Sequence, residues 1–253
     1  MKKIAGLALG LMIAVNSFAQ IKIHSHNDYT HAKPLLQAYA YQAYEIEVDV
    51  FLIGDSLIVA HSKKDKDLTR TINAMYLDPI ANWTKDDAKR GVKTNYGFRL
   101  MIDFKDSWSL VYPVLRKEIE KYGKLFDKGK DKNAVQIVIS GSRPADSLYH
   151  TFPSWVYFDG LPNVNYAKTD LKRITMISDN FATYSKWKGV GEIPIADKIK
   201  LKKIIEQAHQ LNKPMRFWGA PDTQDCWKQL VDLGVDIINT DKIVECKTYF
   251  EHK

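Results

Sequence analysis

Short apolar runs rich in β-branched residues alternate with longer segments of helical periodicity along most of the chain. Eight of these runs have the length and composition of strands: 21–24, 44–51, 98–104, 135–140, 155–159, 173–178, 215–218 and 236–239. Four segments between them have the pattern of helices: 34–43, 109–122, 196–211 and 223–233. This repeated alternation predicts a (β/α)₈ TIM barrel of the α/β class.

The length and composition fit a single domain. The chain has 253 residues, of which 45% are hydrophobic, and this is enough to bury one sizeable core. No low-complexity segment, and no linker rich in Pro, Gly or Ser, divides it. Single barrels of about 250 residues are common. We therefore expect one barrel domain over residues 20–253, and the composition excludes disordered, collagen-like and disulfide-scaffold proteins.

The beginning of the chain has the pattern of a secretory signal peptide. Lys2 and Lys3 precede an apolar stretch, 4–15, and the small-x-small sequence of 17–19 resembles a cleavage site. A membrane anchor is the alternative, but the apolar stretch is shorter than the roughly 20 residues that cross a bilayer. The pattern predicts that residues 1–19 are removed and that the protein is exported, to the periplasm or outside the cell.

Without those residues, 35 basic and 30 acidic side chains remain, which gives a net charge of +5. This mild excess is compatible with an anionic substrate or with peripheral membrane contact. The sequence shows no motif for binding nucleic acid, and it implies no protein partner. The two cysteines, Cys226 and Cys246, would be able to pair in an oxidising compartment, and two free buried thiols are equally compatible with the sequence.

Chemically active side chains occur at the ends of the first predicted strands. His24 ends the first strand, Glu47 and Asp49 lie in the second, and Asp103 and Lys105 end the next. In a barrel, the carboxyl ends of the strands converge on one mouth. Residues two apart on a strand share a face, and the neighbours of Glu47 and Asp49 are apolar. We therefore expect both acids to point into the barrel.

The three carboxylates, Glu47, Asp49 and Asp103, predict a site for one hard divalent cation, Mg²⁺ or Ca²⁺. Like charges in a barrel interior are costly unless positive charge lies between them, and carboxylate oxygens are the ligands that hard cations prefer. Lys105 shares the face of Asp103 and offers a cation for a substrate anion. For any one of these acids, a structural ion pair is the alternative.

Histidines provide a candidate acid/base pair. His24 and His26 belong to the sequence HSHNDY, and His61 follows the apolar run 57–60. Two imidazoles that face each other across a cation are able to take a proton from a nucleophile and to give one to a leaving oxygen. We expect structural roles for the remaining histidines: His31, His150, His209 and His252.

Together these motifs resemble the glycerophosphodiester phosphodiesterase family, which belongs to the superfamily of barrels similar to phosphatidylinositol-specific phospholipase C. The features that carry the resemblance are E-x-D at 47–49, the hairpin that ends at His61, F-W-G at 217–219 and the closing segment 233–241. The D-F-K sequence at 103–105 is similar to a motif of sphingomyelinase D in the same superfamily. The resemblance implies a metal-dependent phosphoric diester hydrolase that acts on a glycerophosphodiester or phospholipid-type head group.

The resemblance also implies roles for individual residues. His24 and His61 would be the acid/base pair, Lys105 would bind the phosphate, and the aromatic Trp218 would contact the substrate. The cation would be held by Glu47, Asp49 and Asp103. HSHNDY stands where the family usually has His-Arg-Gly, so His26 and Asn27 are the candidates to replace the arginine. The base is either His24 or His26, and we favour His24 because it directly follows the apolar strand.

Two other functions remain open at this point. A His-x-His sequence after the first barrel strand is typical of amidohydrolases and of hydrolases similar to histidinol phosphatase, which bind transition metals. A barrel that binds a phosphoester or a glycan without catalysis is the other alternative. The sequence does not identify the alcohols on either side of the phosphate, and the segments 62–97 and 160–172, which we expect to be irregular, are where specificity would be determined.

Overall fold

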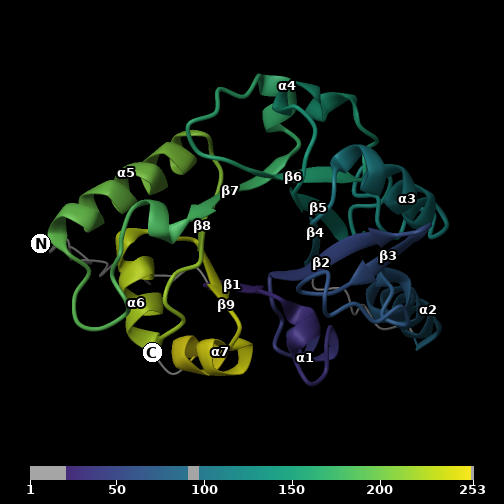
Figure 1. The fold of residues 1–253 in the computed structure, drawn as a ribbon, viewed down its shortest axis with the longest axis horizontal. Helices are drawn as coiled ribbons and strands as arrows, with labels where there is room; N and C mark the ends of the chain where they lie inside the picture. Colours follow the sequence, from purple (N-terminus) through teal and green to yellow (C-terminus); the bar gives the residue numbers. More distant parts are fainter. Residues whose placement is uncertain (1–20, 91–96, 252–253) are drawn as a thin grey trace, which may run out of the picture.

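Eight parallel strands close into a barrel in the computed structural model, which describes residues 21–90 and 97–251 (Figure 1). The ring closes because β1 pairs with both β2 and β9. The barrel strands, in order, are β1 (Lys22–Ser25), β2 (Glu45–Ile53), β4 (Arg99–Phe104), β5 (Gln136–Gly141), β6 (Val156–Gly160), β7 (Ile174–Asn180), β8 (Met215–Trp218) and β9 (Ile237–Thr240). All eight predicted strands are present, and the TIM-barrel prediction is confirmed. The predicted signal peptide, 1–19, lies outside the described residues.

Helices surround the barrel on the outside, as Figure 1 shows. They are α1 (Leu36–Ala40), α2 (Asp78–Arg90), α3 (Trp108–Glu120), α4 (Lys168–Leu171), α5 (Ile195–Gln210), α6 (Gln224–Leu233) and α7 (Ile243–Glu251). The four predicted helices correspond to α1, α3, α5 and α6, with ends that differ by up to three residues. The connection from β5 to β6 contains a 3₁₀ helix, η3 (Asp146–Thr151), in place of an α-helix.

The expectation that 62–97 and 160–172 are irregular was wrong in part. The first segment contains a π-helical turn, η2 (Asn73–Leu77), that continues directly into α2, and the second contains the short α4. α2 escaped sequence analysis because polar residues occupy most of its positions after the first turn, so few apolar residues mark the helix.

The strand β3 (Ser56–Val59) stands outside the ring and pairs antiparallel with the far end of β2. Figure 1 shows it beside β2. Because β2 continues beyond the level at which its parallel neighbours end, this hairpin returns the chain to the carboxyl end of the barrel. The hairpin therefore delivers His61 to the mouth.

The barrel has an apolar floor beneath polar positions. Met101, Val138, Met176 and Ile237 pack together inside the ring, and Tyr44 lies against them. Two residues further along β4, the inward position is Asp103. The larger apolar core lies between the strands and the surrounding helices. The polar side chains of the interior are therefore confined between an apolar floor and the mouth.

The two cysteines are free, buried thiols, which decides between the two possibilities left open by the sequence. Burial raises the pKa of the Cys226 thiol to about 12, and burial also raises the pKa of Cys246. Both thiols are therefore protonated and unreactive at neutral pH. Within the described residues, no helix combines the length and the hydropathy needed to cross a bilayer.

Candidate active site

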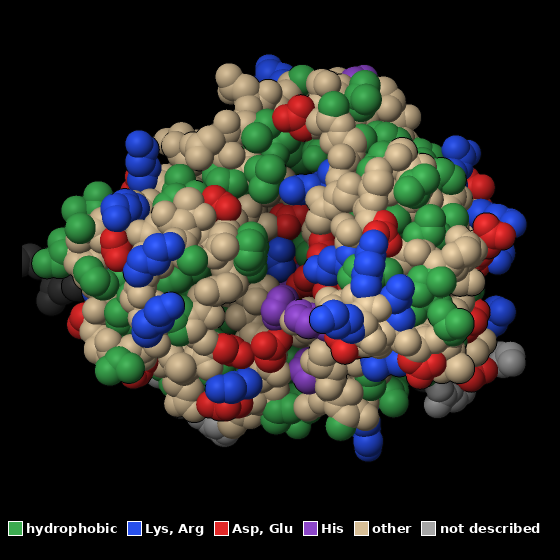
Figure 2. Space-filling view, viewed as in Figure 1, with side chains coloured by type: hydrophobic (Ala, Val, Ile, Leu, Met, Phe, Trp, Pro, Cys, Tyr) green, Lys and Arg blue, Asp and Glu red, His purple; other side chains and the backbone are tan. Residues whose placement is uncertain are grey.

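The carboxyl ends of the barrel strands surround a cavity of about 380 Å³. Figure 2 shows a hollow near the centre of the molecule, with acidic and basic side chains in its depth and histidines at its edge. Eight of the nine predicted site residues line this cavity: His26, Asn27, Glu47, Asp49, His61, Asp103, Lys105 and Trp218. His24 is the exception.

The three predicted metal ligands lie together at the bottom of the cavity. Glu47, Asp49 and Asp103 each offer an oxygen, and these oxygens lie within 4.8 Å of one another. The register explains this, because Asp49 on β2 pairs directly with Asp103 on β4. Asp49 Oδ1 is buried and has no hydrogen-bond partner among the described residues. An unpartnered carboxylate oxygen beside two further carboxylates is the donor set that a hard cation requires, so the residues fit the predicted ion.

Lys105 shares this cluster. Its Nζ lies 2.9 Å from Asp49 Oδ2 and also contacts Asp103 Oδ2. Burial lowers the pKa of Lys105, but the charges of Asp103 and Asp49 outweigh burial and raise this pKa to about 12. Burial and the charge of Glu47 raise the pKa of Asp49 to about 6, even with the lysine beside it. One lysine therefore leaves part of the negative charge uncompensated.

The position of Asp103 depends on its neighbours on β5. Ser140 Oγ donates a hydrogen bond to Asp103 Oδ1 at 2.9 Å. The following residue, Gly141, has a φ of +68°, and a Cβ there would lie only 2.3 Å from the same oxygen. A glycine is therefore required at 141 for both its backbone conformation and the room that Asp103 occupies.

The structure does not place His24 where a general base must be, and this corrects the preference stated above. His24 is fully buried. Its Nδ1 lies 2.8 Å from Glu45 Oε2, and its Nε2 lies 2.5 Å from Glu47 Oε2, so both nitrogens donate to carboxylates. His24 lies within β1 and is buried in the barrel, whereas His26 follows the end of β1, in the turn that leaves the strand. No ring nitrogen of His24 is left for a substrate.

His26 has the position that was expected for His24. It lines the cavity, and its Nδ1 donates to Asp241 Oδ1 at 2.8 Å, which leaves Nε2 as the proton acceptor. Burial lowers the pKa of His26, but the hydrogen bond to Asp241 and the charges of Glu47 and Asp241 outweigh burial, so the pKa is raised above 6.5. Arg216 opposes this rise. The pair of imidazole and carboxylate is an arrangement in which the second group orients the base.

His61 is anchored in a similar way through Tyr29. The hydroxyl of Tyr29 lies 2.8 Å from Asp49 Oδ2 and 3.2 Å from His61 Nδ1. Its single proton is donated to the carboxylate, which is the charged acceptor, and the hydroxyl oxygen accepts from His61 Nδ1. Asn27 lies beside this group with its Oδ1 3.0 Å from the same hydroxyl. His61 therefore also keeps Nε2 for exchange with a substrate.

An ionic network of buried residues lines part of the cavity. Arg216 on β8 is buried, and its Nη2 donates to Asp159 Oδ2 at 3.0 Å. Its Nη1 lies 3.6 Å from Glu47 Oε2 and donates to Asn239 Oδ1 at 3.1 Å. Arg216 Nη1 is also 2.7 Å from His24 Nε2, but that nitrogen cannot accept while it donates to Glu47. Burial raises the pKa of Glu47. The hydrogen bond from His24 and the charges of His24 and Arg216 outweigh burial, and they hold this pKa well below its usual range.

Sequence reasoning missed several residues of the site: Tyr29, Glu45, Arg143, Asp159, Arg216 and Asp241. Two of them carried a usable signal. Glu45 has the same parity as Glu47 and Asp49 on β2, and Arg216 stands between apolar residues in a predicted strand. Both were therefore recognisable as inward-pointing charges.

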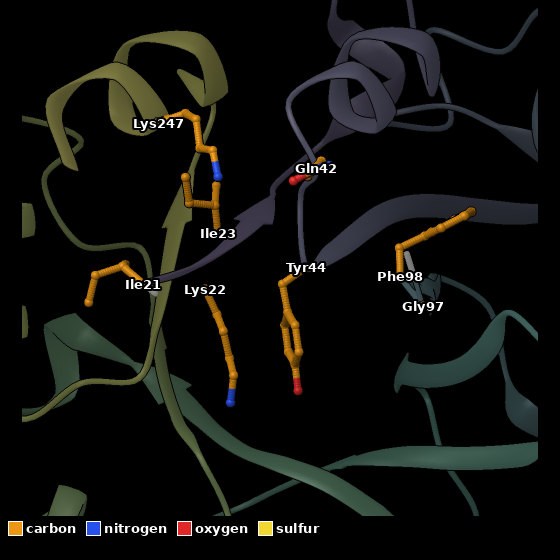
Figure 3. A pocket seen from close by; sticks show the side chains of 8 residues that line it. All are labelled: Ile21, Lys22, Ile23, Gln42, Tyr44, Gly97, Phe98 and Lys247. Carbon is orange, nitrogen blue, oxygen red and sulfur yellow. The ribbon is translucent and has the colours of Figure 1, made fainter. Parts of the chain in front are cut away.

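A second hollow, of about 220 Å³, lies at the opposite end of the barrel and is shown in Figure 3. Lys22 and Tyr44 point in the same direction there, and Lys247 reaches toward it from α7. The Tyr44 ring lies 5.0 Å from Lys22 Nζ and 4.4 Å from the guanidinium carbon of Arg99. Among the described residues, no carboxylate or histidine lines this hollow, and the cation–π contacts hold the Tyr44 ring in place. The candidate chemistry is therefore at the mouth.

Comparison with known families gives two matches. The model of the AIM6-like phosphodiesterase domain matches residues 14–159, and the model of the glycerophosphoryl diester phosphodiesterase family matches residues 214–243. Similar curated proteins include altered inheritance of mitochondria protein 6 of Lachancea thermotolerans, which is 26% identical over 88% of this chain and 64% of that protein. The homolog from Arthroderma benhamiae is 24% identical over 91% of this chain and 84% of that protein. The chain thus spans slightly less than two thirds of the length of the first of these relatives.

Solved structures show the same fold. A glycerophosphodiester phosphodiesterase from Parabacteroides distasonis superposes with a TM-score of 0.56 and 16% identity, over 92% of this chain and 98% of that one. A glycerophosphodiester phosphodiesterase from Agrobacterium tumefaciens gives a TM-score of 0.50 and 14% identity, over 91% of this chain and 99% of that one. At these identities the similarity concerns the barrel.

Proposed function

The chain belongs to the family of AIM6-like phosphodiesterase domains, within the glycerophosphodiester phosphodiesterase superfamily, and from this premise we propose that it is a metal-dependent phosphoric diester hydrolase. One observation carries the proposal. Two histidines, His26 and His61, line one cavity with a cluster of three carboxylates, and each histidine has Nδ1 anchored and Nε2 without a partner among the described residues.

The two histidines would divide the proton transfers. His26 Nε2 takes the proton of the attacking hydroxyl or water, while Asp241 stabilises the imidazolium that forms. A new P–O bond forms as the bond from phosphorus to the leaving alcohol breaks. His61, in its protonated form, gives its Nε2 proton to the departing oxygen. The protein therefore returns to its starting state once a proton passes from His26 to His61 through solvent.

Positive charge for the phosphate comes from two sources. Glu47, Asp49 and Asp103 would hold one Mg²⁺ or Ca²⁺, which supplies electrostatic stabilisation of the phosphoryl oxygens when it is bound. Three cationic side chains among the described residues line the cavity: Lys105, Arg143 and Arg216. Arg216 is already paired with Asp159, so Lys105 and Arg143 are the protein's candidate cations for a phosphate. Arg143 is thus a further candidate, besides His26 and Asn27, to replace the arginine that HSHNDY lacks.

The cavity suits a small diester or a lipid head group. Its volume of about 380 Å³ is at the lower end of the range for small-molecule sites. Trp218 is exposed at its rim, where an aromatic face would pack against the alcohol of the substrate. We propose a glycerophosphodiester or phospholipid-type head group as the substrate class. Export of the protein, to the periplasm or outside the cell, is likewise proposed from the pattern of residues 1–19.

The test is a set of phosphodiesters assayed with and without added divalent cations. Glycerophosphocholine, glycerophosphoinositol, a lysophospholipid and bis-p-nitrophenyl phosphate span the proposed class. His26→Ala and His61→Ala should each lower the rate by about 10² to 10⁴. On a p-nitrophenyl ester, which needs no general acid, His61→Ala should recover activity while His26→Ala should not.

The outcomes separate the proposal from its rivals. Near-normal rates of both variants on every diester would instead mean a barrel that binds without catalysis. Restoration of activity by Zn²⁺ alone would favour the His-x-His hydrolases. The structure gives that rival no support, because the metal-type cluster among the described residues contains carboxylates and no histidine.

A further inference from the structure

An apolar side chain protrudes from the loop between β7 and α5. Val190 is 85% exposed. It stands between Gly189 and Gly191, which have φ values of +89° and +68°. Residues other than glycine rarely adopt this left-handed backbone conformation, so the two glycines turn the chain on both sides of the valine. Such a loop presents its central side chain outward.

Hydrogen bonds hold this loop in place. The indole Nε1 of Trp187 donates to the carbonyl of Val190 at 2.9 Å. Gln229, on α6, donates from Nε2 to the carbonyl of Gly191 at 3.0 Å and accepts from the backbone N–H of Ile193 at 2.9 Å. Ile193 itself is buried. The exposure of Val190 is therefore built into the fold by specific bonds on both sides.

The first turns of α5 extend the apolar surface. Ile195 and Ile199 are 79% and 66% exposed, and residues four apart lie on the same face of a helix. The opposite face of α5 carries Leu201 and Ile205, which are buried against the barrel. We call Val190, Ile195 and Ile199 the aliphatic patch. Exposed apolar side chains that occur together in one segment are candidates for an interaction site.

Lysines are numerous in the segment that carries the aliphatic patch. Figure 2 shows lysines interspersed with hydrophobic side chains over α5, on the left of the view. Two acids of the same segment, Glu192 and Asp197, are already paired with lysines. Residues 186–206 contain six lysines and three acids, so positive charge is in excess along this segment. Four exposed lysines of this segment have no carboxylate partner among the described residues: Lys186, Lys188, Lys202 and Lys203.

The aliphatic patch lies near the mouth of the barrel. The loop that carries it follows β7, whose residue Asp179 lines the cavity, after a short 3₁₀ helix, η4 (Phe181–Thr183). A Cβ on Gly189 would lie 2.9 Å from Pro221, which follows the rim residue Trp218 by three positions. A surface that contacted the patch would therefore be close to the entrance of the cavity.

We propose that the aliphatic patch and its lysines dock the protein onto an anionic lipid bilayer. Aliphatic side chains with flanking lysines have the chemistry that interfacial membrane binding uses. A second copy of this chain fits less well, because a symmetric dimer through the patch would bring the same lysines together. The inference goes beyond the proposed function, because docking requires no catalysis, and it would place the mouth beside a lipid head group.

The first test is co-sedimentation with vesicles of phosphatidylcholine, with and without phosphatidylglycerol. The full chain should bind the anionic vesicles and bind the neutral ones more weakly. The combined variant Val190→Ser, Ile195→Gln and Ile199→Gln should bind the anionic vesicles at least about tenfold more weakly. Lys188→Gln and Lys202→Gln should each weaken binding by about fivefold.

The matched control is Leu110→Gln. Leu110 is 59% exposed on α3, which lies across the barrel from α5 in Figure 1, so the control removes a similar apolar exposure elsewhere. It should bind like the unchanged chain. Thermal melts of all variants check that they are folded. Turnover of glycerophosphocholine, a water-soluble diester, should be unchanged in the aliphatic-patch variant, so loss of docking and failure of the proposed catalysis are distinguishable.

A second measurement places the contact directly. Cys226 and Cys246 are buried, so in Val190→Cys the new thiol is the one that a polarity-sensitive fluorophore labels. Emission should move to shorter wavelength when anionic vesicles are added, and a label on Leu110→Cys should not respond. Emission that is already at short wavelength without vesicles would mean that a second copy or the apolar segment 4–15 covers the patch. That result, or vesicle binding unaffected by the aliphatic-patch variant, would overturn the proposal.

Discussion

Removal of the buried guanidinium of Arg216 tests whether this residue neutralises the buried carboxylates around it. In the fold, Arg216 faces Asp159 at 3.0 Å and Glu47 at 3.6 Å, and Glu45 lies on the far side of His24. Three carboxylates are thus held inside the barrel by one arginine and one histidine. Arg216→Met keeps much of the side-chain volume and removes the charge.

The expected loss of stability follows from burial. Loss of one partner from a buried ion pair costs about 3–5 kcal/mol, because the remaining charge stays away from water. Burial already raises the pKa of Asp159 in spite of the neighbouring Arg216, so this acid is able to take up a proton when the guanidinium is gone. That proton uptake places the expected loss near the lower value, about 3 kcal/mol. Small proteins have a total of about 5–15 kcal/mol, so the effect is large.

Urea unfolding at pH 7 in EDTA, followed by circular dichroism, measures this loss without a contribution from bound cations. The matched control is Arg116→Met, which breaks an exposed pair with Glu120 at a distance of 2.7 Å and should have a far smaller effect. Asp159→Asn added to Arg216→Met should recover part of the loss, because it removes one of the unpaired charges. A loss below about 1 kcal/mol for Arg216→Met would refute the charge-balance reasoning.

The remaining predictions concern the cation and the base. EDTA should abolish turnover and Mg²⁺ or Ca²⁺ should restore it; full activity in EDTA would exclude a metal role. Gly141→Ala should weaken the thermal stabilisation that a cation provides, because a Cβ at 141 would displace Asp103. The left-handed backbone at 141 should also cost the alanine variant roughly 1–2 kcal/mol of unfolding free energy in urea. Unchanged cation affinity would contradict the first expectation. The kcat/KM of the unchanged chain should rise with pH through a pKa above 6.5, since His26 must lose its proton to act as base, and Asp241→Asn should move that rise to lower pH. An unmoved profile would remove Asp241 from that role.

The sequence predicted the barrel because its strands and helices are each locally patterned. Side-chain alternation along one strand was enough to point Glu47 and Asp49 inward, and the carboxyl end of another strand was enough to add Asp103. The choice between His24 and His26 was different in kind. It depends on which carboxylate faces each ring, and Glu45 and Asp241 belong to other strands or to their ends, at sequence separations of 21 and 215 residues. A local sequence pattern does not show which distant carboxylate contacts each histidine.

The depth of each inward residue determines its role in this barrel. Two positions in sequence separate His24, which lies within β1 and is enclosed by carboxylates, from His26, which lies just after β1 and lines the cavity. On β2, Glu45 bonds the buried His24 and does not line the cavity, while Glu47 bonds the same histidine and also lines the cavity. Glu47 therefore links the two levels, and its orientation is fixed from below by His24 before any cation or substrate arrives. For that reason His24→Ala should lower cation affinity more than it alters the pH dependence of turnover, whereas His26→Ala should remove catalysis and leave cation-dependent stabilisation largely intact; the opposite pattern would return the role of base to His24.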